Sequence, residues 1–174
     1  RARIDDRKFF LNDSDQYAQI GATASDGKIA FAPSKEGFFK ITPDEEFKTK
    51  ISSLFLIKLE NDGSADIRIS ETFSGMAFAA MKKTLEELTP ENLRRLYEEK
   101  ASELSHSAVI SGTPLKNFDA YPGKFEMSLK IPNFANFANN RIYFSLPERP
   151  RALASAQFSR ENPFFLTEIM KTKN

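Results

Sequence analysis

The sequence contains no cysteine and no tryptophan, and His106 is its single histidine. Without a thiol, the chain has neither a cysteine nucleophile nor a disulfide, and cysteine-based zinc and iron–sulfur sites are excluded within it. We expect His106 to be structural or solvated, because no serine or aspartate motif accompanies it. The 174 residues are enough to bury a core without cross-links.

The chain also lacks a charge excess of either sign and a long apolar run. Its 25 basic and 24 acidic residues give a formal net charge of +1. Such a balance leaves no electrostatic footprint for nucleic acid, and no stretch approaches the roughly 18 apolar residues of a membrane span. We therefore expect no nucleic-acid partner and no membrane span. The charged opening, residues 1–6, leads us to expect a chain cut from a longer polypeptide.

Phenylalanine is abundant instead, with 17 residues. We expect most of these side chains in the core, because they carry no polar group. Two alternating segments, 54–60 and 65–73, flank residues 61–64, where Gly63 can adopt the positive φ of a tight turn. This pattern predicts a β-hairpin. Residues 124–131 alternate most regularly and predict a strand with one buried and one wet face.

Between these strands the apolar period changes from two to between three and four, which predicts two amphipathic helices within about residues 76–105. Thr89 suits the N-cap and Pro90 the first position of the second helix. Each helix has one apolar stripe, formed by Ala77, Phe78, Met81, Leu85 and Leu88 in the first and by Leu93, Leu96, Tyr97, Ala101 and Leu104 in the second. We expect the helices to pack on each other and on a sheet.

The whole pattern predicts a mainly β (α+β) chain, an antiparallel β-sandwich with an inserted pair of amphipathic helices. Further short strands are expected at residues 8–11, 28–32, 37–41, 108–110 and 141–146. The polar stretch 42–46 indicates a boundary. We therefore predict two units, residues 1–46 and a sandwich domain over residues 47–174.

Residues 133–140 form an asparagine-rich stretch that we predict to be a long loop. Phe134 and Phe137 in this stretch are candidate ligand-binding residues, because aromatic rings flanked by amides can stack on a sugar or grip a peptide. The same rings can instead fold back and close the open end of the sandwich, which we favour.

Acidic residues offer two further hypotheses. Asp13 and Asp15 could bind calcium, but the third acidic position, the loop glycine and the distant glutamate of an EF-hand are missing, so a turn-stabilising role is favoured. A carboxylate hydrolase needs two acids in one cleft, with Asp13, Asp44 and Glu126 as candidates. We predict no metal site and no cofactor.

Residues 11–21, Leu-Asn-Asp-Ser-Asp-Gln-Tyr-Ala-Gln-Ile-Gly, resemble the closing segment of the transglutaminase-like core in a family of multidomain bacterial proteins. The family pattern is roughly Leu-Asp-x-Thr-Asp-x-Tyr-Ala-x-x-Gly. Residues 61–64, 71–75, the helix pair and residues 160–166 resemble the β-rich domain of unknown function that follows this core. The resemblance implies that residues 1–46 are the C-terminal remnant of the core.

The family's core carries a papain-like Cys-His-Asp triad, and the aspartate of this pattern orients the histidine. Asn12 matches that catalytic position, with Asp13 beside it, and asparagine can also orient a histidine. Because the chain has no cysteine, the resemblance implies a non-catalytic accessory domain of a transglutaminase-like protease, packed on the upstream core or binding a partner. It also implies a periplasmic location. The alternative is a carbohydrate- or peptide-binding sandwich module.

Overall fold

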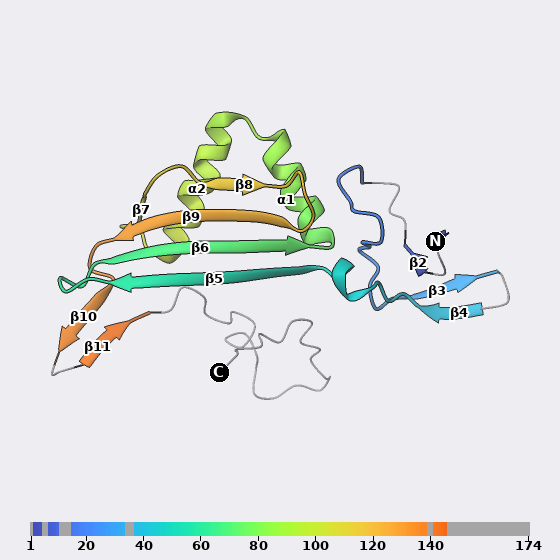
Figure 1. The fold of residues 1–174 in the computed structure, drawn as a ribbon, viewed down its shortest axis with the longest axis horizontal. Coiled ribbons are helices and arrows are strands. Elements are labelled where there is room, and N and C mark those ends of the chain that lie inside the picture. Colours follow the sequence, from blue (N-terminus) through green and yellow to red (C-terminus); the bar gives the residue numbers. More distant parts are fainter. Residues whose placement is uncertain (1, 5–6, 11–14, 34–36, 139–140, 146–174) are drawn as a thin grey trace, which may run out of the picture.

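The computed structural model describes residues 2–4, 7–10, 15–33, 37–138 and 141–145. Its central feature is an antiparallel sheet that begins with a hairpin of two ten-residue strands, β5 (Lys50–Leu59) and β6 (Ala65–Ser74). β9 (Gly123–Ile131) pairs with the other edge of β6. β7 (Val109–Ile110) and β8 (Leu115–Asn117) both pair with β9, which completes a five-stranded sheet (Figure 1).

The predicted hairpin is confirmed, and its turn is built from local hydrogen bonds. The Asp62 carboxylate accepts from the backbone amide of Ser64 at 2.9 Å and from its hydroxyl at 2.6 Å. Gly63 has a φ of +84°, and a Cβ at this position would lie 2.4 Å from the carbonyl oxygen of Ala135. The amide of Ala135 donates to the carbonyl of Gly63 at 2.9 Å. Glycine is therefore required both by the turn and by the chain that crosses it.

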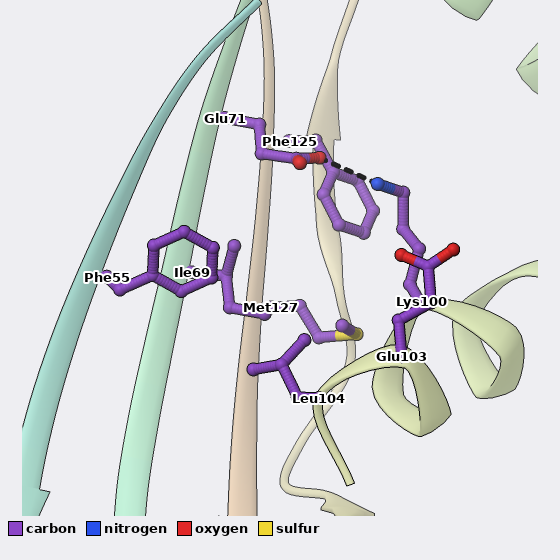
Figure 2. A pocket seen from close by; sticks show the side chains of 8 residues that line it. All are labelled: Phe55, Ile69, Glu71, Lys100, Glu103, Leu104, Phe125 and Met127. Atoms are coloured by element: carbon purple, nitrogen blue, oxygen red, sulfur yellow. Dashed lines mark hydrogen bonds and ion pairs between the residues drawn. The ribbon is translucent and has the colours of Figure 1, made fainter. Parts of the chain in front are cut away.

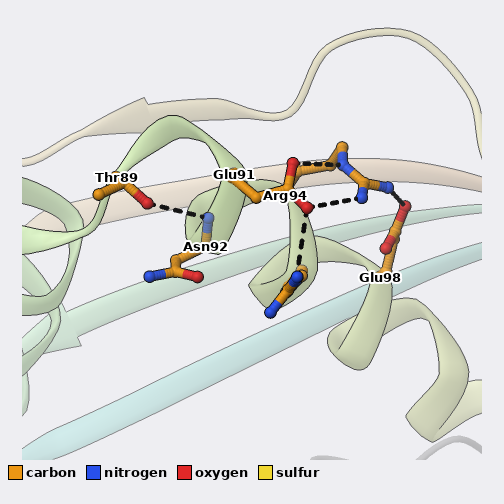
Figure 3. A network of polar contacts seen from close by, with 6 residues as sticks. Thr89, Glu91, Asn92, Arg94 and Glu98 are labelled. Atoms are coloured by element: carbon orange, nitrogen blue, oxygen red, sulfur yellow. Dashed lines mark hydrogen bonds and ion pairs between the residues drawn. The ribbon is translucent and has the colours of Figure 1, made fainter.

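The predicted helix pair is also confirmed, as α1 (Met76–Glu87) and α2 (Pro90–Leu104). The Thr89 hydroxyl caps α2 by accepting from the amide of Asn92 at 3.3 Å. On the outer side of α2, Glu91 lies 3.0 Å from Arg94, which also contacts Glu98 (Figure 3). These pairs make a solvated, charged helix surface. Each such pair stabilises a helix by about 0.2–0.5 kcal/mol.

The core lies between the sheet and the helix pair. Every second residue of β9, from Phe125 to Ile131, is only 1–2% exposed, and Ile67 of β6 is equally buried. The helices contribute buried Phe78, Leu85 and Ala101, and their other stripe residues except Leu88 pack against this cluster. The mainly β, α+β class with antiparallel strands is confirmed. Among the described residues, the layer on this face of the large sheet is the helix pair rather than a second sheet (Figure 1).

The junction between β6 and α1 is held by a tyrosine from a distant loop. The amide of Gly75, whose φ is +58°, donates to the hydroxyl of Tyr121 at 2.9 Å. The same hydroxyl donates to the backbone carbonyl of Glu46. Glu46 belongs to the short 3₁₀ helix η1 (Glu45–Phe47), and Phe47 lies 6.0 Å from the Tyr121 ring. These contacts join residues on the two sides of the predicted boundary at residue 46. The division into two units at this boundary stays a prediction.

Within the described residues, three two-stranded antiparallel sheets accompany the large one. β1 (Ala2–Ile4) pairs with β2 (Arg7–Phe9), and β3 (Ile29–Ala32) pairs with β4 (Gly37–Lys40). β10 (Ala135–Ala138) pairs with β11 (Arg141–Phe144) beside the β5–β6 turn (Figure 1). The prediction of one long loop over residues 133–140 is thus wrong, because residues 135–138 are a strand. Pairing with the following segment overrides the weak strand preference of alanine and asparagine.

Candidate functional site

The helix pair covers one face of the large sheet, which we call the covered face. A partly buried ion pair lies on this face. Lys100 of α2 places its Nζ atom 2.8 Å from an Oε atom of Glu71 on β6, and the two side chains are 24% and 14% exposed (Figure 2). The same Nζ lies 5.4 Å from the centre of the Phe125 ring. The ammonium group is therefore held by a carboxylate and by an aromatic face together.

This ion pair borders a small pocket between the sheet and the end of α2. The pocket has a volume of about 70 Å³, and its remaining lining is mostly apolar: Phe55, Ile69, Glu103, Leu104 and Met127 (Figure 2). A volume of this size holds a few water molecules, whereas pockets for organic ligands occupy roughly 300–1,000 Å³. We conclude that the Glu71–Lys100 pair anchors α2 to the sheet.

The opposite face of the sheet carries a larger, shallow concavity of about 450 Å³. Its side-chain lining is mainly polar: Leu56, Lys58, Asp66, Arg68, Ser111 and Ser128. The strand register places Leu56 opposite Arg68, which in turn lies opposite Ser128. The next row places Lys58 opposite Asp66 and Asp66 opposite Lys130. We call this surface the open face.

Apolar residues mark both margins of the open face. On β5, Leu54 and Leu56 are 55–56% exposed. At the other margin, Val109 and Leu115 are 62% and 65% exposed. The open face thus combines a charged centre with apolar edges, and it can bind a partner through both kinds of contact.

β5 also offers its backbone, because among the described residues it pairs only with β6. Along these ten residues, every second residue points its N–H and C=O groups away from β6, and these unpaired groups are a template for another strand. At the turn end of this edge, Glu60 lies 2.8 Å from the Nζ atom of Lys58, and this hydrogen bond and charge raise the pKa of the lysine. The ammonium group of Lys58 is therefore balanced by the carboxylate of Glu60 at this end of the edge.

The structure separates the two predicted ligand-binding residues. Phe134 is partly buried, packs against the core and lies 5.7 Å from the Phe144 ring. Phe137 is 51% exposed on β10, opposite the equally exposed Ile142. The two rings therefore differ in exposure, although Phe144, which contacts Phe134, lies on the same side of the hairpin as Phe137.

The other predicted site residues that the structure describes lie on separate elements. Asn12 and Asp13 lie outside the described residues, as does the segment 160–166. Asp15 accepts a hydrogen bond from the amide of Tyr17 at 3.0 Å, which is a turn-stabilising contact. Asp44 precedes η1, and Glu126 lies on the open face. Within the described ranges, no group of three or more metal-ligating side chains occurs, and no helix is long and apolar enough to cross a membrane.

Sequence reasoning missed the open face, although one signal for it exists. Residues 54–57 are Leu-Phe-Leu-Ile, an apolar run that places large side chains on both faces of β5. A run of this kind is typical of a strand covered on both sides. It indicates a second contact surface.

Comparison with known proteins finds no relative: no protein-family model, no curated protein and no solved structure matches this chain. The resemblance of residues 11–21 to a transglutaminase-like core therefore stays a prediction.

Proposed function

We propose that this chain is a non-catalytic accessory module that binds another polypeptide through the open face of its large sheet. The observation that carries the proposal is the apolar run over residues 54–57, with large side chains on both faces of β5. The helix-side residues Phe55 and Ile57 pack against the core. Leu54 and Leu56 on the open face stay more than half exposed. A partner that covers the open face would complete the burial of this strand.

The charged centre of the open face supports the choice of a polypeptide as partner. Arg68, Asp66 and Ser128 offer donors and acceptors in adjacent rows. A polypeptide surface can pair with such groups while it buries the flanking leucines, as in interfaces that form and separate.

The family resemblance indicates which polypeptide the partner would be. Residues 11–21 resemble the end of a bacterial transglutaminase-like core, so the module would pack on such a core in the periplasm. In this proposal the core supplies any thiol chemistry, because a chain without cysteine cannot form a thioester.

Activity measurements test the non-catalytic part of the proposal. We expect no turnover when the isolated chain is incubated with peptides and amine acceptors under conditions that activate transglutaminases. A rate that a single substitution within this chain abolishes would reject it.

Binding measurements test the open face. The chain and the transglutaminase-like core that the resemblance places before it would be expressed separately and titrated by calorimetry. We expect Arg68→Glu and Leu56→Glu to weaken binding at least tenfold. Lys83→Glu is the matched control, because it reverses one exposed positive charge on α1, away from the open face. Equal loss in all three variants would show that the open face is not the contact.

A second candidate function is favoured by the β10–β11 hairpin. Tyr143 is 52% exposed and lies directly opposite the exposed Asn136, so one side of this hairpin presents a ring beside an amide. This arrangement suits a sugar or a peptide, which is the alternative that Phe134 and Phe137 raised. A titration with glycans and peptides, followed through the ring resonances of Tyr143 and Phe137, tests it. No shift with any ligand would remove this candidate.

A further inference from the structure

Among the described residues, the edge of β5 that faces away from β6 is unpaired over its whole length, and its charged side chains are those of Lys50 and Lys58. It contains neither proline nor glycine, and it carries no acidic residue over Lys50–Leu59. Soluble proteins usually shorten, twist or cover such an edge, because it pairs readily with another strand. Ile51, Leu54 and Leu56 along it are 53–56% exposed. The question is which strand fits this edge.

A second copy of β5 is a candidate, because two identical strands can pair antiparallel about a two-fold axis. The pleat restricts the register, since a residue on the open face must lie opposite a residue on the open face. In the register centred on Phe55, Leu54 lies opposite Leu56 of the second copy. Ile51 then lies opposite Leu59, and Ile57 lies opposite Ser53.

The charges select the same register. With Phe55 at the centre, Lys50 lies opposite Glu60 of the second copy, and the two-fold axis makes this ion pair twice. Glu60 already contacts Lys58, but a carboxylate has two oxygens and can accept a second cation. Shifting the centre to Leu54 would instead place Lys50 opposite Lys58 twice, and directly opposed like charges destabilise a sheet.

We propose that two copies of this chain associate edge to edge through β5, antiparallel and centred on Phe55. The helix pairs of both copies then lie on one side, and the two open faces join into one broader surface. This inference does not depend on the proposed binding of a core, because it concerns the isolated chain alone.

A charge swap tests the proposed register. Sedimentation equilibrium over a wide concentration range should show a reversible dimer for the unmodified chain. Lys50→Glu and Glu60→Lys each turn two attractive pairs into repulsive ones, so each should raise the dissociation constant about tenfold. The double variant should restore dimerisation, which also shows that the single variants act through charge rather than through folding. Lys83→Glu on α1 is the control and should leave the dimer unchanged.

Disulfide trapping gives an independent readout, and the absence of native cysteine makes it clean. A mixture of the Leu54→Cys and Leu56→Cys variants should form a cross-linked dimer faster than either variant alone. Faster trapping of Leu54→Cys with itself would instead indicate the register centred on Leu54 and overturn the proposal.

Two further outcomes would overturn it. One is a dimer that the charge swaps leave unaffected. The other is a monomer at every concentration. If the β5 amides that point away from β6 were then protected from hydrogen exchange, another segment would cover the edge. Deleting residues 146–174 would show whether that segment is the C-terminal one.

Discussion

The two faces of the large sheet are built from alternating residues of the same strands, yet they differ in their surroundings. On the face under the helices, Phe125, Met127 and Leu129 of β9 are 1–2% exposed. On the open face, the intervening Lys124 and Lys130 are exposed and Glu126 is partly exposed. In β9 the side-chain chemistry therefore matches the environment at each of these positions.

β5 breaks this match. Its covered-face residues Phe55 and Ile57 pack against the core, as expected for apolar side chains. Its open-face residues Leu54 and Leu56 are also apolar but remain more than half exposed. The comparison shows that β9 carries the sequence of a strand at a water interface, whereas β5 carries that of an interior strand. This mismatch is why we place binding at β5.

The largest expected difference in unfolding free energy is between substitutions on the two faces of β9. Phe125→Ala should lower the free energy of unfolding by about 3–5 kcal/mol, because it leaves a cavity under α2. Glu126→Ala, the next residue on the open face, should change it by less than about 0.5 kcal/mol. Urea denaturation of both variants measures the difference. Similar losses in the two variants would contradict the assignment of the faces.

The Glu71–Lys100 pair tests whether the covered face tolerates a charge only when it is paired. Glu71→Gln or Lys100→Met alone should cost about 1–3 kcal/mol, because each leaves a partly buried partner behind. The double variant should cost less than the sum of the two. A double-mutant cycle by urea denaturation measures this coupling, and additive losses would show that the two groups do not interact.

Substitutions in the β5–β6 turn should have a smaller effect on the free energy of unfolding, and this effect should depend on pH. The hydroxyl and amide of Ser64 hold the pKa of Asp62 below its ordinary value of 3.8. A depressed folded-state pKa contributes stability above the unfolded pKa, and this contribution is lost as the pH falls through the folded value.

We therefore expect the chain to lose stability on acidification below about pH 4, and the Asp62→Asn variant to lose less over the same range. Ser64→Ala removes only the hydroxyl donor and should show an intermediate slope. Urea midpoints measured between pH 6 and pH 3 give these slopes. Identical slopes in all three proteins would exclude a role for this turn.

The smallest expected effect is on the open face of β5. Leu56→Thr should change the free energy of unfolding of the monomer by less than about 0.5 kcal/mol, because the side chain is already largely solvated. Ile57→Thr, its covered-face neighbour, should cost clearly more. Both are measured at dilute concentration by urea denaturation. A large loss for Leu56→Thr would show that the monomer itself buries this leucine.

The elements that depend on residues close together in the sequence were predictable. The β5–β6 hairpin follows from alternation around Gly63, the start of α2 from Thr89 and Pro90, and the burial of β9 from its strict period. The β10 strand was missed because its own residues have weak strand preference, although β11 follows after only two residues and pairs with it as a hairpin.

The candidate site was less predictable. Glu71 and Lys100 are 29 positions apart and come from a strand and a helix, so no spacing rule brings them together. Phe134 and Phe137 are close in sequence but end in different environments, one against the core and one exposed. The family resemblance at Asn12 falls on residues outside the described ranges.

The sequence by itself determined the β5–β6 hairpin, the two helices and β9 together with their buried sides, because side-chain period and capping act over a few residues. Only the tertiary structure decided that β6 lies between β5 and β9, that the helices cover one face, and that β5 stands at the edge. Those outcomes depend on which distant surfaces exclude water together, and the free energy of that burial is a property of the packed chain rather than of any segment.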